Sequence, residues 1–275
     1  MRPSPSSPLG VFDSGLGGLT VVRALRALLP HEDILYLGDT ARVPYGTKGE
    51  GTVVRYAAAC AKHLVKYDVK AIVIACNTVS AVAPERLRAE LDLPIIGVIE
   101  PGAEAAVRTS VTGKIGVLAT QATINSGAYA RAVMSASTRA EVVQQAAPLL
   151  VPLVEEGWLE GEVPKLAIER YLEPFVRAKV DTIVLGCTHY PLLRPLIEEA
   201  AKRMISKDVR IIDSASAVAS TVATFLQARS LANTDSSNVG KVRIQVTDLP
   251  RSFELVATRF LGNSAEGVEQ VDLVP

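Results

Sequence analysis

Short apolar runs alternate with amphipathic stretches along nearly the whole chain. Runs rich in Val, Ile and Leu occupy residues 9–12, 34–38, 70–75, 94–98, 115–119, 181–186 and 209–212. Most of them precede a segment with the period of an amphipathic helix, the longest being 50–66. Runs that are apolar at successive positions are typical of parallel strands covered by helices on both faces. The pattern therefore predicts an α/β fold with parallel sheets.

The last fifty residues follow a looser pattern. Residues 227–240 are polar and predict a loop, residues 242–246 a strand, residues 250–260 a helix and residues 268–273 a last strand.

Two of the apolar runs are nearly alike, and each ends in a cysteine. Residues 70–78 read KAIVIACNT, and residues 181–189 read DTIVLGCTH. Open α/β sheets bind ligands at the carboxyl ends of their strands, so we expect Cys76 and Cys187 to share one site. The repeated unit indicates two similar domains whose parallel-sheet cores face each other across a cleft.

Paired thiols are compatible with several chemistries. Disulfide exchange requires sulfurs close enough to bond. Two-base proton transfer instead places a substrate between a thiolate and a thiol. A cysteine nucleophile with His189 as its base is a third option, but it leaves Cys76 unexplained. A free cysteine is often a small core residue, and this we expect for Cys60 within the helix 51–66.

The loop 13–18, DSGLGG, joins a predicted strand to a predicted helix. Backbone amides and the helix dipole form an anion site at such a junction, although glycines in a tight turn explain the loop equally well. It is neither the dinucleotide fingerprint nor a Walker loop. The polar groups of Asn77, Thr78 and Thr188 suit a substrate carboxylate, and Asp13 suits an ammonium group.

Composition excludes several classes of protein. Lys plus Arg and Asp plus Glu number 29 each, so the formal net charge is zero, which argues against a nucleic-acid partner. No apolar run reaches the length of a membrane span. The three cysteines include no CxxC pair, and no HExxH motif occurs, so we expect neither a disulfide framework nor a metal. Residues 1–8 lack a secretory signal, which favours a cytoplasmic protein.

A set of motifs in fixed order resembles bacterial glutamate racemase from about Gly10 to Asp213. They are FDSGLGG at 12–18, GDTARVPYG at 38–46, ACNT at 75–78, IGVIEPGA at 96–103, VLAT at 117–120, PLVE at 152–155 and GCTHYPLL at 186–193. Aspartate and hydantoin racemases share the paired cysteines and the architecture but generally lack this combination.

The resemblance implies an enzyme that interconverts L- and D-glutamate without a cofactor and supplies D-glutamate for peptidoglycan. It implies a homodimer. It also implies that the second domain is an insertion, so the first domain would comprise residues 9–98 plus 211–275 and the second residues 99–210. A racemase of another amino acid such as aspartate, a non-catalytic amino-acid binding module and a thiol–disulfide enzyme are the alternatives.

The resemblance also assigns roles to single residues. Cys76 and Cys187 would be the acid/base pair, with Asp13 and His189 as further catalytic residues. The substrate would be lined by Asp13, Ser14, Tyr45, Gly46, Asn77, Thr78, Thr188 and His189. Asp39 and Glu155 would be supporting acidic residues, with Glu156 as the neighbouring alternative to Glu155. For an isolated carboxylate, the residues alone favour a solvated loop or a helix cap.

Overall fold

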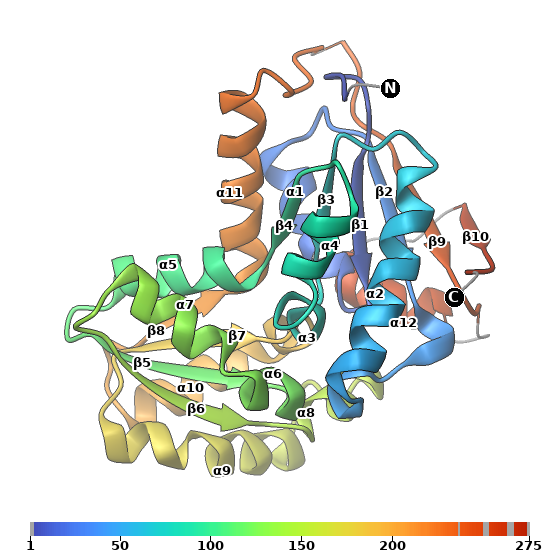
Figure 1. Ribbon diagram of the computed structural model, residues 1–275. Helices are drawn as coiled ribbons and strands as arrows, with labels where there is room; N and C mark the ends of the chain where they lie inside the picture. The colour runs from blue at the N-terminus through green and yellow to red at the C-terminus, as the bar shows by residue number, and fades with distance from the viewer. Residues whose placement is uncertain (1–2, 236, 250–252, 263–266, 274–275) are drawn as a thin grey trace.

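The protein is built around two parallel β-sheets, one in the upper and one in the lower part of Figure 1. The computed structural model describes residues 3–235, 237–249, 253–262 and 267–273. One sheet has six strands in the order β10-β9-β2-β1-β3-β4, and the other has four in the order β6-β5-β7-β8. The predicted fold of two α/β domains with parallel-sheet cores is confirmed.

The six-stranded sheet carries the first half of the site. Its strands are β1 (Leu9–Asp13), β2 (Ile34–Gly38), β3 (Ala71–Ile74), β4 (Ile95–Gly97), β9 (Val242–Val246) and β10 (Val268–Gln270). All of its strand pairs are parallel. Each residue of β1, β2 and β3 is buried, as expected for strands with helices on both faces.

The four-stranded sheet carries the second half. It comprises β5 (Lys114–Ala119), β6 (Glu141–Ala146), β7 (Thr182–Gly186) and β8 (Arg210–Asp213). The sequence analysis missed β6. This strand reads EVVQQA and pairs only with β5, so no residue of it is buried and its glutamines interrupt the apolar run.

Strand β8 bears on where the chain returns to the first domain, which the sequence analysis expected at residue 211. Ile211 pairs with Ile183 of β7, and Asp213 pairs with Leu185, so β8 completes the second sheet. The following helix α11 (Ser214–Ala228) packs against both α1 (Leu19–Leu28) and α5 (Ile99–Thr109). We therefore propose Ser214 as the start of the returning segment.

Helices cover both sheets (Figure 1). The remaining ones are α2 (Glu50–Val65), α3 (Asn77–Ser80), α4 (Pro84–Glu90), α6 (Gln121–Ser126), α7 (Ala128–Ala136), α8 (Leu150–Glu155), α9 (Glu162–Ala178), α10 (Arg194–Met204) and α12 (Phe253–Leu261), with short 3₁₀ turns η1 (Thr40–Arg42), η2 (Tyr45–Thr47) and η3 (Tyr190–Leu193). The expected start of the last helix at residue 250 lies outside the described residues. Within the described ranges, no helix is both long and apolar enough to cross a membrane.

A buried ion pair stands at the amino end of β3, opposite to the edge that carries the cysteines. The Lys70 ammonium group pairs with Glu32, and both side chains are almost completely buried. Lys70 Nζ also donates to the carbonyl oxygens of Pro5 at 2.7 Å and Leu231 at 2.9 Å. The pair therefore ties two surface segments to the sheet.

Replacing Lys70 with methionine should leave the Glu32 carboxylate buried without its counter-charge. Breaking a buried pair from one side costs about 3–5 kcal/mol in the free energy of unfolding, which urea denaturation would measure. The control is Arg86→Met, which removes an exposed pair with Glu90 and should cost less than about 1 kcal/mol. Equal losses in the two variants would contradict this account of the Lys70 pair.

Candidate active site

Cys76 and Cys187 lie at the carboxyl ends of strands from the two different sheets. Cys76 follows β3 as the N-cap residue of α3, and Cys187 directly follows β7. Both residues are buried, with 5% and 6% of their surfaces exposed. Burial is the main reason that the pKa of Cys76 is raised, and a charge on Cys187 adds to it. The two cysteines therefore lie at the carboxyl ends of parallel strands, one from each sheet.

Cys76 is surrounded by the loop 13–18. Its Sγ donates to Ser14 Oγ at 3.5 Å. Asp13 Oδ2 accepts from the backbone amides of Gly15 at 3.2 Å and Gly18 at 3.0 Å. Burial, and then the nearby Asp13 charge, raise the pKa of Cys76 to about 12. Cys76 therefore holds its proton at neutral pH.

Asp13 is itself a perturbed acid. Its carboxyl is buried, and burial raises its pKa, although the nearby His189 charge and the backbone amides act in the opposite direction. Among the described residues, its Oδ1 atom has no hydrogen-bond partner. That oxygen is therefore a ready acceptor for an ammonium group.

Cys187 stands at one end of a chain of three polar side chains. Its Sγ lies 3.9 Å from His189 Nδ1, and His189 Nε2 lies 3.1 Å from Glu155 Oε1. Burial alone would lower the pKa of His189, but its contacts with Cys187 and Glu155 outweigh burial and raise it to about 10. The imidazole is therefore positively charged at neutral pH.

Glu156 lines an outer apolar groove with Trp158, so Glu155 is the carboxylate on the site.

Asp39 holds Tyr45 in place at the edge of the first sheet. The Tyr45 phenol donates to Asp39 Oδ2, while Asp39 Oδ1 accepts from Thr247 Oγ1 at 2.9 Å and pairs with Arg42 at 3.2 Å. Burial is the main reason that the pKa of Tyr45 is raised, and the phenol stays protonated. The next residue, Gly46, lies against the second domain, since a Cβ there would be 3.1 Å from Thr120 Cβ.

Asn77 and Thr78 make contacts between the two domains. The carboxamide oxygen of Asn77 accepts from the Tyr129 hydroxyl of the second domain at 2.7 Å, while its nitrogen donates to Ser214 Oγ, at the start of the returning segment, at 3.4 Å. Thr78 Oγ1 lies 3.0 Å from Thr120 Oγ1. The sequence analysis missed these junction partners. Only Thr120, the last residue of the VLAT motif, carried a signal that could have pointed to the junction.

Gly17 brings the loop 13–18 into direct contact with the residues after Cys187. A Cβ at Gly17 would lie 2.3 Å from Thr188 Oγ1 and 2.7 Å from His189 Nδ1, so a larger residue does not fit. Thr20 Oγ1 donates to the Gly17 carbonyl at 2.8 Å and lies 3.3 Å from the Thr188 carbonyl. Segments from the two domains therefore form a single site.

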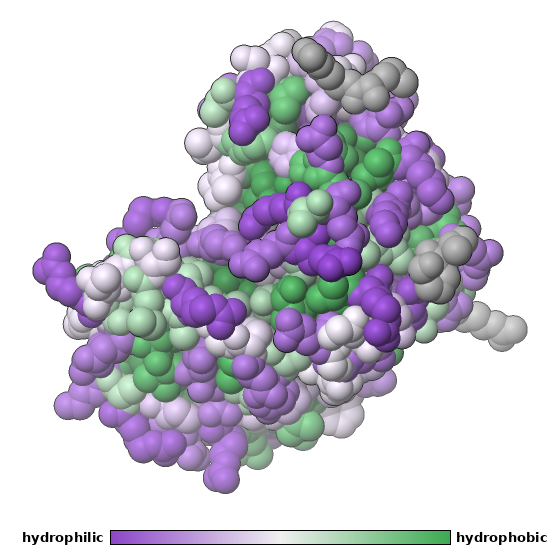
Figure 2. Space-filling view, in the orientation of Figure 1, coloured by the Kyte–Doolittle hydropathy of each residue, from purple (hydrophilic) through white to green (hydrophobic). Residues whose placement is uncertain are grey.

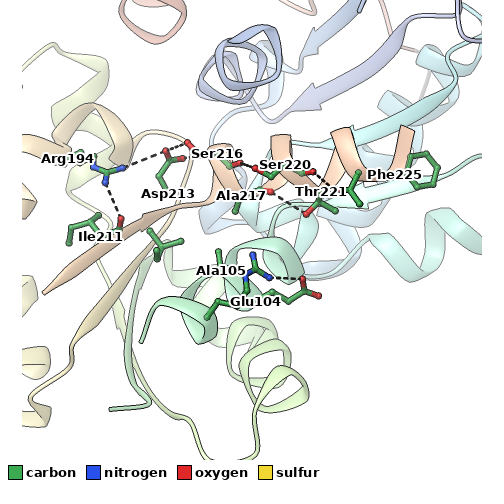
Figure 3. A pocket seen from close by; sticks show the side chains of 13 residues that line it. Glu104, Ala105, Arg194, Ile211, Asp213, Ser216, Ala217, Ser220, Thr221 and Phe225 are labelled. Carbon is green, nitrogen blue, oxygen red and sulfur yellow. Dashed lines mark hydrogen bonds and ion pairs between the residues drawn. The ribbon is translucent and has the colours of Figure 1, made fainter. Parts of the chain in front are cut away.

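A cavity of about 810 Å³ lies elsewhere, in the corner between α5, α10 and α11 (Figure 3). In the space-filling view this corner is an indentation at the left edge of the molecule (Figure 2). Its polar lining includes Arg194 and Asp213, which pair with each other at 3.9 Å. None of the predicted site residues lines it, so it is separate from the site around the cysteines.

Comparison with known proteins gives a consistent result. A family model described as Asp/Glu/Hydantoin racemase matches residues 19–222. The chain is 49% identical over 267 residues to the glutamate racemase of Neisseria meningitidis serogroup C, covering 97% of each chain. The chain belongs to the glutamate racemase family.

Solved structures of family members share the fold. The glutamate racemase of Francisella tularensis in complex with D-glutamate has a TM-score of 0.90 at 38% identity, covering 98% of each chain. An isoform from Bacillus anthracis has a TM-score of 0.91 at 38% identity, covering 97% of this chain and 98% of its own. The family and fold predicted from the motifs are confirmed.

The charge on His189 should depend on Glu155 and not on the adjacent Glu156. Glu155→Gln removes the carboxylate that stabilises the imidazolium, so the pKa of His189 should fall from about 10 by about one unit or more. NMR of ¹⁵N-labelled histidine would measure the pKa, because the chain has only three histidines. The matched control, Glu156→Gln, should leave it unchanged. A larger shift in Glu156→Gln than in Glu155→Gln would contradict the assignment.

Proposed function

We propose that this protein interconverts L- and D-glutamate by transferring protons between Cys76, Cys187 and the Cα atom of the substrate. The observation that carries the proposal is the pair of buried thiols at the carboxyl ends of strands from two separate sheets. Support comes from relatives named glutamate racemase and from the Francisella protein that binds D-glutamate.

The two thiols have different electrostatic surroundings. Racemisation needs a base on one face of Cα and an acid on the other. The raised pKa of Cys76, about 12, suits the acid. The charged His189 beside Cys187 can pair with a thiolate, which suits the base. Cys187 would then remove the proton from L-glutamate, as the family resemblance implies, and Cys76 the proton from D-glutamate.

The developing carbanion must be stabilised by groups of the protein if no cofactor takes part. Oδ1 of Asp13 would accept from the substrate ammonium group, whose retained charge lowers the energy of the carbanion. Ser14, Thr188 and the backbone amides nearby would bind the carboxylates. Asn77 and Thr78 would also bind the substrate. Because both already contact the second domain, substrate binding would be coupled to the contact between the domains. Tyr45 and Gly46 would line the site beside Asp39.

The biological setting follows from the family resemblance. We propose that the protein works without an added cofactor or metal, in the cytoplasm and as a homodimer, and that its D-glutamate enters peptidoglycan. Assays with glutamate and aspartate would identify the substrate. Faster racemisation of aspartate would indicate the alternative activity, and binding of D-glutamate without turnover would indicate a binding module.

Replacing either Cys76 or Cys187 with alanine should lower racemisation by about 10³-fold or more, because alanine cannot exchange a proton at its face of Cα. Circular dichroism would follow racemisation in both directions, and urea denaturation would check the fold. The matched control is Cys60→Ala, since Cys60 in α2 is buried among apolar residues of the first domain. It should racemise at nearly the unaltered rate. Near-normal turnover in Cys76→Ala or Cys187→Ala would refute the two-base assignment.

A further inference from the structure

The carboxyl-terminal helix α12 reaches the Cys187 side of the site. Its buried residues are Phe253, Ala257, Phe260 and Leu261, and they belong to the same apolar cluster as Cys187 and Tyr190. The helix also packs against α1. The helix α12, which belongs to the returning segment, therefore packs in the same apolar cluster as Cys187 of the other domain.

Phe260 packs directly on His189. The Phe260 ring is fully buried, its centroid lies 5.0 Å from that of the imidazole, and the two planes meet at 78°. Such an edge-to-face contact favours one orientation of the imidazole. In that orientation Nδ1 faces Cys187 and Nε2 faces Glu155. The Phe260 ring thus limits rotation of the His189 imidazole, which lies between Cys187 and Glu155.

Arg259 fixes the backbone that carries Glu155. Its Nη1 donates to the Glu155 carbonyl at 2.6 Å. At Gly157, whose φ is +78°, a Cβ would lie 2.6 Å from Arg259 Nη2, so the guanidinium occupies the space that a side chain would need. The Glu155 side chain is 50% exposed, so its carboxylate depends on a fixed backbone to remain on His189.

We propose that Phe260 and Arg259 are positioning residues that hold the His189–Glu155 pair in line with Cys187, and that they thereby control proton transfer at one face of the substrate only. The proposal rests on the proposed racemase function. His189 is also faced by Thr188, at 3.4 Å, and by the charge of Asp13, and neither belongs to α12. Cys76, at the other face, is contacted by Ser14.

The first test uses glutamate analogues with a leaving group at Cβ, one of each Cα configuration. Removal of the Cα proton then expels the leaving group, so each analogue reports on one base alone. Cys187→Ser identifies the analogue that Cys187 deprotonates. Phe260→Leu should slow elimination from that analogue by about 10-fold or more, because a small misplacement of a reacting group is costly. The other analogue should change by less than about 3-fold.

The matched control is Phe253→Leu, which removes an equally buried ring from the same helix at a position for which no contact with His189 is described. It should change both elimination rates by the same factor. Arg259→Met should act like Phe260→Leu, whereas Arg259→Lys should recover most of the lost rate, because lysine keeps a cationic donor.

A second readout needs no turnover, which separates failure of this proposal from failure of the proposed function. Histidine NMR without substrate should show a lower pKa for His189 in Phe260→Leu and no change in Phe253→Leu. Equal slowing of both analogues in Phe260→Leu, together with an unchanged His189 pKa, would overturn the proposal.

Discussion

The site depends on the close approach of two loops at Gly17. The loop 13–18 follows β1 in one sheet, and Thr188 and His189 follow β7 in the other. The space that a Cβ would need at Gly17 is already occupied by the side chains of Thr188 and His189. A substituent at this position would push the two loops apart. Asp13, Ser14 and Cys76 would then no longer share a site with Cys187 and His189.

The two thiols of this site are chemically identical but have different electrostatic surroundings. Cys76 lies near a buried carboxylate that favours its protonated form. Cys187 lies near an imidazole whose pKa is raised, against the effect of burial, by its contacts with Cys187 and Glu155. In the proposed mechanism this difference gives each face of Cα a thiol that is already in the protonation state required to convert L-glutamate to D-glutamate. Each cysteine follows a strand of a parallel sheet, but the side chains that come after the two cysteines differ.

The sequence predicts the fold well where burial dominates. Strands such as β1, β2 and β7 are buried throughout and mostly apolar, so their positions follow from the pattern alone. The edge strand β6 was missed because its glutamines interrupt the apolar run. The pairing of β8 with β7 could not be predicted because the residues of a strand do not specify its partner.

The sequence likewise predicts some parts of the candidate site and not others. The motifs identify Cys76, Cys187 and the polar residues beside them. The contacts of His189 with Phe260, and of Glu155 with Arg259, join residues that are far apart in the chain. Nothing in the local sequence indicates such a contact. The Asn77 partners Tyr129 and Ser214 were missed for the same reason.

The most direct test of the central claim is racemisation of L-glutamate in deuterated water without added cofactor, followed by mass spectrometry of both enantiomers at early times. The account predicts D-glutamate that carries deuterium at Cα and residual L-glutamate that is mostly unlabelled. The thiol that reprotonates Cα has exchanged with solvent before catalysis, and it is not the thiol that removed the original proton. D-glutamate that retains a large share of the original Cα proton would show a single base and contradict the account.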